Sequence, residues 1–84
     1  MAAIQDHVPR DDVRSSVALL TPRQLDVFLL LGKGMSTRQI AHRLTVTEHT
    51  VKAHTAAILN ALGLESRLQA GLAAYAYARA VAQD

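Results

Sequence analysis

The stretch "STRQIAHRLTVTEHTVKAHTAAILNALG", residues 36–63, decides the fold because it contains two helix starts separated by a short link. Ser36 with Gln39 forms a capping-box pattern, in which each side chain accepts from the other residue's backbone amide. A second helix begins after Thr47, where Glu48 suits the positive end of the helix dipole. The link, residues 44–47, is so short that the two helices must cross sharply, as in a helix-turn-helix.

The same start signals recur on both sides of this stretch. "TPRQ" at 21–24 and "SRLQ" at 66–69 repeat the capping-box pattern, and Pro22 falls where a helix needs no amide donor. Gly32 and Gly34 after the first helix, and Gly63 after the third, are expected to supply left-handed conformations at the helix ends. The sequence therefore predicts an all-α fold with four helices near 22–31, 37–43, 48–62 and 67–82.

Residues 1–20 contain a proline and scattered charges without a sustained period, which predicts an N-terminal arm or linker before a domain at 21–84. Only a short turn of helix is expected there, around Val13, Val17 and Leu20. An 84-residue chain with 4% aromatics and no cysteine has room for one aliphatic core without disulfides. The first helix is expected to contribute a stripe of Leu25, Phe28 and Leu29 to this core. The second buries Ile40, Ala41 and Leu44, and exposes Arg38, His42 and Arg43.

The helix at 48–62 has two faces when it is drawn with about 100° per residue. The expected core face spans roughly 60° and carries Val51, Thr55, Ile58 and Leu62. The outer face, centred about 145° away, carries His49, Lys52, Ala53, Ala56 and Asn60.

This outer face suits close approach to DNA. It has no acidic side chain, and its alanines would let the backbone come near base edges and place a methyl group against a thymine methyl. Lys52 can donate to guanine or to phosphate. The alternative is that the alanines are present only for their helix propensity.

The sequence gives little support for metal binding or catalysis. His49 and His54 lie about 140° apart on the helix, so they cannot chelate one ion, and no zinc-binding motif includes His7 or His42. No nucleophile is paired with a base. The sequence predicts no metal, no cofactor and no enzyme activity.

The charge distribution favours a polyanion partner. Two basic against three acidic residues give 1–20 a net charge of −1, whereas seven basic against four acidic residues give 21–84 a net charge of +3. The start of the chain lacks the pattern of a signal peptide, and the longest apolar run, 70–78, is too short for a membrane span. We therefore expect a soluble, cytoplasmic protein with no membrane contact.

Residues 20–70, from "LTPRQ" through "IAHRL", "TVKAH" and "ILNALG" to "SRLQA", closely resemble the LuxR-type (NarL/FixJ-type) helix-turn-helix domain of bacterial transcription regulators. The resemblance implies a sequence-specific binder of double-stranded DNA, either the output domain of a response regulator or a short stand-alone regulator, with RNA polymerase as a further partner. Its recognition helix, 48–62, would enter the major groove. The implied base contacts are His49, Lys52, Ala53 and Ala56, and the implied phosphate contacts are Thr47, Thr50, His54, Arg67 and Arg38.

The last helix is expected to form a homodimer. Gly71, Ala74 and Ala78 have a small-residue spacing that permits close helix approach, with Tyr75 among them, and the resemblance implies dimerisation through this helix. The alternative is an alanine-rich tail that packs on its own domain.

The sequence also departs from the family pattern. Ala56 and Ala61 replace side chains that are often polar or basic in relatives, which predicts weaker electrostatic binding. The alternative function is therefore a helix-turn-helix used as a protein-interaction module or anti-regulator without DNA binding. A sigma-factor promoter-binding domain shares the fold but fits "LG" and "SRLQA" less well.

Overall fold

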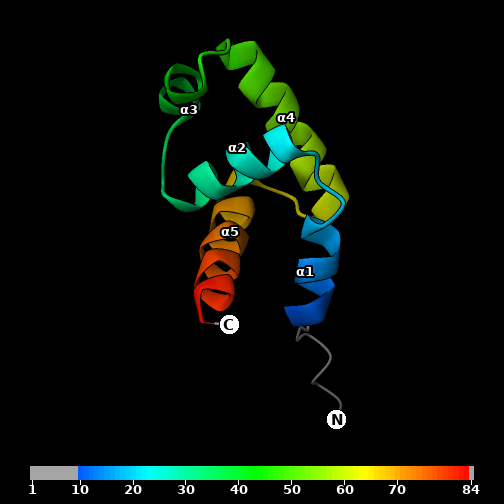
Figure 1. Cartoon of the computed structure of the whole chain (residues 1–84). Coiled ribbons are helices and arrows are strands. Elements are labelled where there is room, and N and C mark those ends of the chain that lie inside the picture. The colour runs from blue at the N-terminus through cyan, green and yellow to red at the C-terminus, as the bar shows by residue number, and fades with distance from the viewer. Residues whose placement is uncertain (1–9, 84) are drawn as a thin grey trace.

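The computed structural model describes residues 10–83, and within this range it contains five α-helices and no strand. The prediction of an all-α fold is confirmed, and the four predicted helices agree with the structure to within one residue at each end (Figure 1). The fifth is an additional helix near the N-terminus. The helices are α1 (Arg10–Val17), α2 (Pro22–Gly32), α3 (Thr37–Leu44), α4 (Glu48–Leu62) and α5 (Arg67–Ala82).

Helix α1 is longer than the short turn that the sequence indicated. It packs against α4 and α5, and Arg14 donates a hydrogen bond from Nη2 to the carbonyl oxygen of Ala80 at 3.3 Å. Val17 is 4% exposed and Leu20, just beyond the helix, is 9% exposed. These tertiary contacts, which a local pattern does not reveal, stabilise an eight-residue helix that would be marginal alone. Residues 1–9 and the side chain of Val13 lie outside the described part of the chain.

Helix α2 lies at the centre of the molecule, between α5 on one side and α4 on the other (Figure 1). Its buried residues are Val27, Phe28, Leu30 and Leu31. Of the predicted stripe, Phe28 is fully buried, and Leu25 and Leu29 are half-buried and pack against the core. A helix with neighbours on two sides buries a wider arc than a single stripe, so Val27, Leu30 and Leu31 are buried as well.

Two of the three predicted capping boxes form as expected. Thr21 and Gln24 exchange hydrogen bonds of 3.0 and 3.1 Å at the start of α2, and Ser36 and Gln39 do so at 2.8 and 3.1 Å at the start of α3. These bonds satisfy amides that a helix start leaves without partners.

The third predicted box, at α5, is shifted by one residue. Ser66 Oγ accepts from the amide of Gln69 at 3.2 Å, but Gln69 Oε1 accepts from the amide of Glu65, at 2.7 Å, and not from that of Ser66. The backbone at Ser66 is more extended, with φ −146° against −68° at Thr21. The chain therefore enters α5 along a different path and presents the preceding amide to the glutamine.

The glycines at the helix ends have two different roles. Gly63 caps α4 with φ 67°, and Gly34 has φ 79° in the turn after α2, as expected. The prediction was wrong for Gly32, which is the last residue of α2 and does not adopt a positive φ. A Cβ there would lie 2.8 Å from Ala74 Cβ and 2.9 Å from the amide nitrogen of Tyr75. Position 32 has no room for a side chain because α5 crosses α2 at this point.

Candidate nucleic-acid interface

Helix α4 divides into the two faces that its sequence predicted. Val51 and Ile58 are 0% exposed, and Thr55 is half-buried, with Oγ1 donating to the carbonyl oxygen of Val51 at 2.9 Å. Leu62 is half-buried beside them. The residues of the opposite side are all exposed; they are His49, Lys52, Ala53, Ala56 and Asn60. We call these five residues the outer face of α4.

The outer face has no carboxylate, and its only fixed charge is the ammonium group of Lys52. Ala53 and Ala56 leave the helix backbone accessible because their side chains end at Cβ. The single carboxylate of α4, on Glu48, is in the first turn, where its negative charge interacts favourably with the positive end of the helix dipole. This surface can approach a polyanion closely and carries both a cation and methyl groups.

The first turn of α4 is held by a threonine pair. Thr47 Oγ1 accepts from the amide of Thr50 at 3.0 Å and lies 3.0 Å from Thr50 Oγ1. Thr47 is exposed and Thr50 is half-buried. The cap fixes the helix N-terminus, whose remaining amides and dipole favour an anion.

The turn between α3 and α4 depends on an uncommon backbone conformation. Thr45 caps α3 with φ 58° and ψ 49°, and its amide points at the carbonyl oxygens of Ala41 and His42. Within residues 10–83 it is the only residue other than glycine with a positive φ. The left-handed step ends α3 and lets the chain enter α4 after only a short link. The sequence gives no sign of it, because neither glycine nor asparagine occupies the position.

Arg67 ties the helix-turn-helix to α5. Its Nη1 donates to Thr37 Oγ1 at 2.7 Å, and its Nη2 donates to the carbonyl oxygen of Met35. Thr37 is the first residue of α3 and Met35 belongs to the turn before it. The guanidinium group, which the family resemblance placed at the DNA backbone, therefore has partners inside the domain.

The other implied phosphate contacts lie on α3 and α4. Arg38 is exposed at the second residue of α3, and His54 is half-buried at the boundary between the two faces of α4. Ala61, where relatives often have lysine, is half-buried against the core. The structure thus brings Thr47, Thr50 and His54 together on one helix, with Arg38 on the helix before it.

The four residues expected at a dimer interface do not share one open surface. Ala74 is 1% exposed in the core, and a Cβ on Gly71 would lie 3.2 Å from the carbonyl oxygen of Leu31 on α2. Tyr75, at 56%, and Ala78 are exposed. The small residues Gly71 and Ala74 therefore serve the packing of α5 on α2 within the domain.

A different set of apolar side chains on α5 is open to solvent. Leu68 is 72% exposed, Leu72 is 61% exposed and Tyr75 follows at the next turn. Their spacing of i, i+4 and i+7 places them on one side of the helix. Leu68 was not among the predicted interface residues, although its position four residues before Leu72 was a signal in the sequence.

Among the side chains that the structure describes, those of residues 14–83, no three from histidine, aspartate or glutamate are arranged to hold a metal ion. None of the helices in that range is long and apolar enough to cross a bilayer.

Comparison with known proteins identifies a family. The family model described as bacterial regulatory proteins, luxR family, matches residues 18–74. The nitrate/nitrite response regulator protein NarL of Escherichia coli is 38% identical over 63 residues, which are 75% of this chain and 29% of that protein. The glycerol metabolism activator of Pseudomonas putida is 49% identical over 55 residues, 66% of this chain and 25% of that protein.

The response regulator protein VraR of Staphylococcus aureus is 39% identical over 57 residues, 68% of this chain and 27% of that protein. The matched residues thus span between 25% and 29% of the length of these three relatives.

Proposed function

This chain belongs to the luxR family of bacterial regulatory proteins, and from that membership we propose that it binds double-stranded DNA sequence-specifically as a transcription regulator. The observation that carries the proposal is the outer face of α4. It is exposed along the helix, free of acidic side chains, and backed by Val51 and Ile58 in the core. A major groove about 12 Å wide admits a rigid helix with such a face.

In this proposal α4 is the recognition helix. Its 15 residues make it about 22 Å long, so its N-terminal half can lie in the groove while its C-terminal half stays on the domain. Lys52 and His49 would donate to base edges, and Ala53 and Ala56 would contact thymine methyl groups. The absence of a large side chain at both alanines allows the backbone to come close.

Phosphate contacts would fix the register of α4 on the duplex. The N-terminal amides of α4, with Thr47 and Thr50, would meet one phosphate backbone, and His54 would reach it from the edge of the outer face. Arg38 is exposed on α3, which would cross the backbone. Arg67 would contribute indirectly, because its bonds to Thr37 and Met35 position α3.

The regulator would act as a homodimer. The exposed side chains of Leu68, Leu72 and Tyr75 on α5 supply an apolar surface that a second copy can cover, with Ala78 at its edge. The relatives are several times longer than the matched segment. The domain would accordingly serve either as the output domain of a longer response regulator or as a short stand-alone regulator, in the cytoplasm and in contact with RNA polymerase.

The test is a salt titration of binding to a random-sequence duplex, measured by fluorescence anisotropy. Contact with about four to six phosphates predicts a log–log slope of about −4 to −5. A flat slope would refute DNA binding and leave the alternative, a helix-turn-helix used as a protein-interaction module. Binding-site selection with the same protein would then define the preferred sequence.

A further inference from the structure

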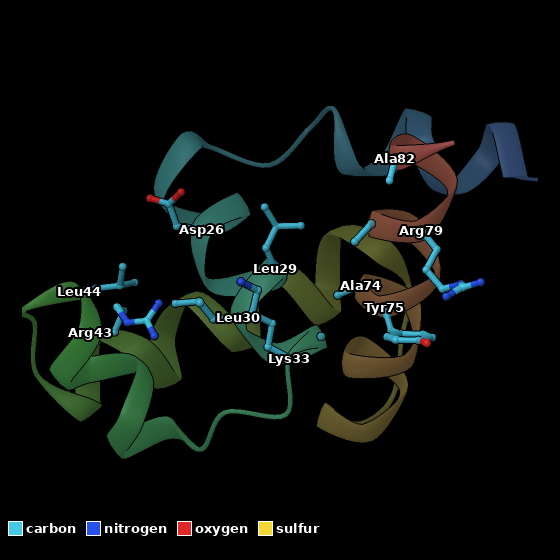
Figure 2. Close-up of a pocket in the computed structure, with 12 residues that line it drawn as sticks. Asp26, Leu29, Leu30, Lys33, Arg43, Leu44, Ala74, Tyr75, Arg79 and Ala82 are labelled. Atoms are coloured by element: carbon cyan, nitrogen blue, oxygen red, sulfur yellow. The ribbon is translucent and has the colours of Figure 1, made fainter. Parts of the chain in front are cut away.

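A groove with an apolar floor opens beside the contact between α2 and α5, away from the outer face of α4. Its volume is about 670 Å³, and no residue of α4 lines it. Figure 2 shows Leu29 and Leu30 of α2 at its centre, with Leu44 and Arg43 at the end of α3 on one side and Ala74 to Ala82 of α5 on the other. The groove is thus built from three helices.

The crossing of α2 and α5 explains why this groove exists. At Gly32 the two helices approach so closely that a Cβ would lie 2.8 Å from Ala74 Cβ. Crossed helices diverge away from their contact point, which leaves space beside the crossing. Leu29 of α2 and Leu44 of α3 border this space and are half-buried.

The rim of the groove is positively charged. Lys33, Arg43 and Arg79 lie on it, against one carboxylate, that of Asp26. That carboxylate is 3.5 Å from Arg23 Nη1, so it is already paired. The guanidinium carbon of Arg79 lies 5.7 Å from the centre of the Tyr75 ring, which holds the cation at the edge of the groove. Within residues 10–83 none of the three rim cations has an ion pair.

We propose that this groove binds an acidic amphipathic helix of a partner protein. The groove, of about 670 Å³, has an apolar floor beside cationic side chains and is therefore complementary to the apolar face and acidic flanks of such a helix. Two or three apolar side chains at i, i+3 or i+4, and i+7 would fill it, as in other helix-in-groove complexes. Glutamate or aspartate on the flanks of the same helix would meet Lys33, Arg43 and Arg79.

Two other occupants fit the groove less well. A phosphate backbone would find cations at the rim but an apolar floor of Leu29, Leu30 and Ala78, which offers it no hydrogen bonds. A second copy joined through the same groove would bring the three rim cations of each subunit close to those of the other, because a two-fold contact uses the same patch twice. Like charges across an interface disfavour it.

The test uses the complete 84-residue chain and two displayed pools of helical peptides. Both pools vary Leu, Ile, Met and Phe at the same apolar positions; the polar positions are glutamate in one pool and lysine in the other. The glutamate pool is expected to yield binders and the lysine pool none. Enrichment from neither pool, or equally from both, would overturn the proposal.

Matched variants then locate the binding. Ala78→Gln places a longer polar side chain in the groove, whereas Ala76→Gln makes the same change at an exposed position of α5 that does not line it. Ala78→Gln, and separately Lys33→Glu with Arg43→Glu, should each weaken binding of the selected peptide at least tenfold, and Ala76→Gln less than twofold. Equal effects of the two alanine variants would contradict the assignment.

Two further measurements separate the competing occupants, and neither requires that the DNA proposal be correct. Peptide affinity is measured with and without a random-sequence duplex, and it should stay within twofold; displacement by the duplex would assign the groove to nucleic acid. Sedimentation of the Lys33→Glu, Arg43→Glu variant should match that of the unmodified chain, because neither residue belongs to the exposed stripe of α5. A loss of self-association in this variant would assign the groove to a second copy.

Discussion

Thr45 is a single residue on which the geometry of the helix-turn-helix depends. Its left-handed backbone, φ 58°, joins α3 to α4, yet a β-branched side chain disfavours that region. The neighbouring caps could be read from the sequence because Thr47 and the Ser36–Gln39 pair are common cap residues. The left-handed conformation of Thr45 could not be read from the sequence. The short link and the packing of α4 impose it, although a threonine disfavours it.

Replacing this threonine should stabilise the domain. Asparagine tolerates the left-handed region, so Thr45→Asn should raise the free energy of unfolding by about 1 kcal/mol, measured by thermal denaturation. Lys33→Asn is the control, because Lys33 is also a helix cap but has φ −89°. A melting temperature for Thr45→Asn that is no higher than that of the control would show that the backbone at Thr45 is not strained.

Arg67 should stabilise the domain through its internal hydrogen bonds. Arg67→Ala removes the donors to Thr37 and Met35, and hydrogen bonds to a charged group are worth about 1.5–3 kcal/mol each. We expect a loss of about 2 kcal/mol in urea unfolding, less than the sum of two such bonds, because Arg67 is only half-buried and water replaces part of them in the variant. Arg38→Ala, an exposed arginine in the same motif, should change stability by less than about 0.5 kcal/mol. Equal effects of the two variants would show that the internal bonds contribute nothing.

At the scale of the helices, the sequence revealed where each strongly capped element begins but not how the elements pack. The outer face of α4 could be predicted because one side of that helix is buried and the period is clear. The stripe of Leu25, Phe28 and Leu29 does pack on the core, but it omitted Val27, Leu30 and Leu31, which are buried because α2 has neighbours on two sides. The length of helix α1 was underestimated because its stability comes from contacts such as that of Arg14 with Ala80, more than 60 residues away along the chain.

The crossing of α2 and α5 can be tested by adding one methyl group. Gly32→Ala would place Cβ 2.8 Å from Ala74 Cβ and 2.9 Å from a backbone nitrogen, so the helices must separate, at a cost of about 1–3 kcal/mol in chemical unfolding. Gly71→Ala meets only one atom within 3.4 Å, at 3.2 Å, and gains about 1 kcal/mol of helix propensity. It should therefore destabilise less. The reverse order would contradict the close crossing at Gly32.

For the whole molecule, the sequence predicted a helical regulator domain, whereas the surface of α5 required the structure. Gly71 and Ala74 of the small-residue series pack closely on α2, whereas Ala78 is exposed. The spacing alone could not distinguish a neighbour in the same chain from a second copy. Burial makes that distinction for Ala74, which lies in the core. The exposed Leu68, Leu72 and Tyr75 become the surface on which a dimer would form.

Self-association should therefore depend on this exposed stripe. We expect the unmodified chain to dimerise at high micromolar concentration in sedimentation equilibrium, and Leu72→Glu to weaken the dimer at least tenfold because it places a charge in an apolar contact. Asn60→Glu, which adds the same charge on the outer face of α4, should leave the association unchanged. A monomeric unmodified chain at that concentration would rule out the homodimer.

Comparing two lysine variants tests whether the outer face of α4 binds DNA. Anisotropy titrations at one fixed salt concentration would use the duplex obtained by binding-site selection. Lys52→Ala should weaken binding by about tenfold or more, the equivalent of about 1–3 kcal/mol for one base contact. Lys33→Ala removes the same charge on the other side of the molecule and should cost less than threefold. Unchanged affinity for Lys52→Ala, or equal losses for the two variants, would contradict the assignment of this face.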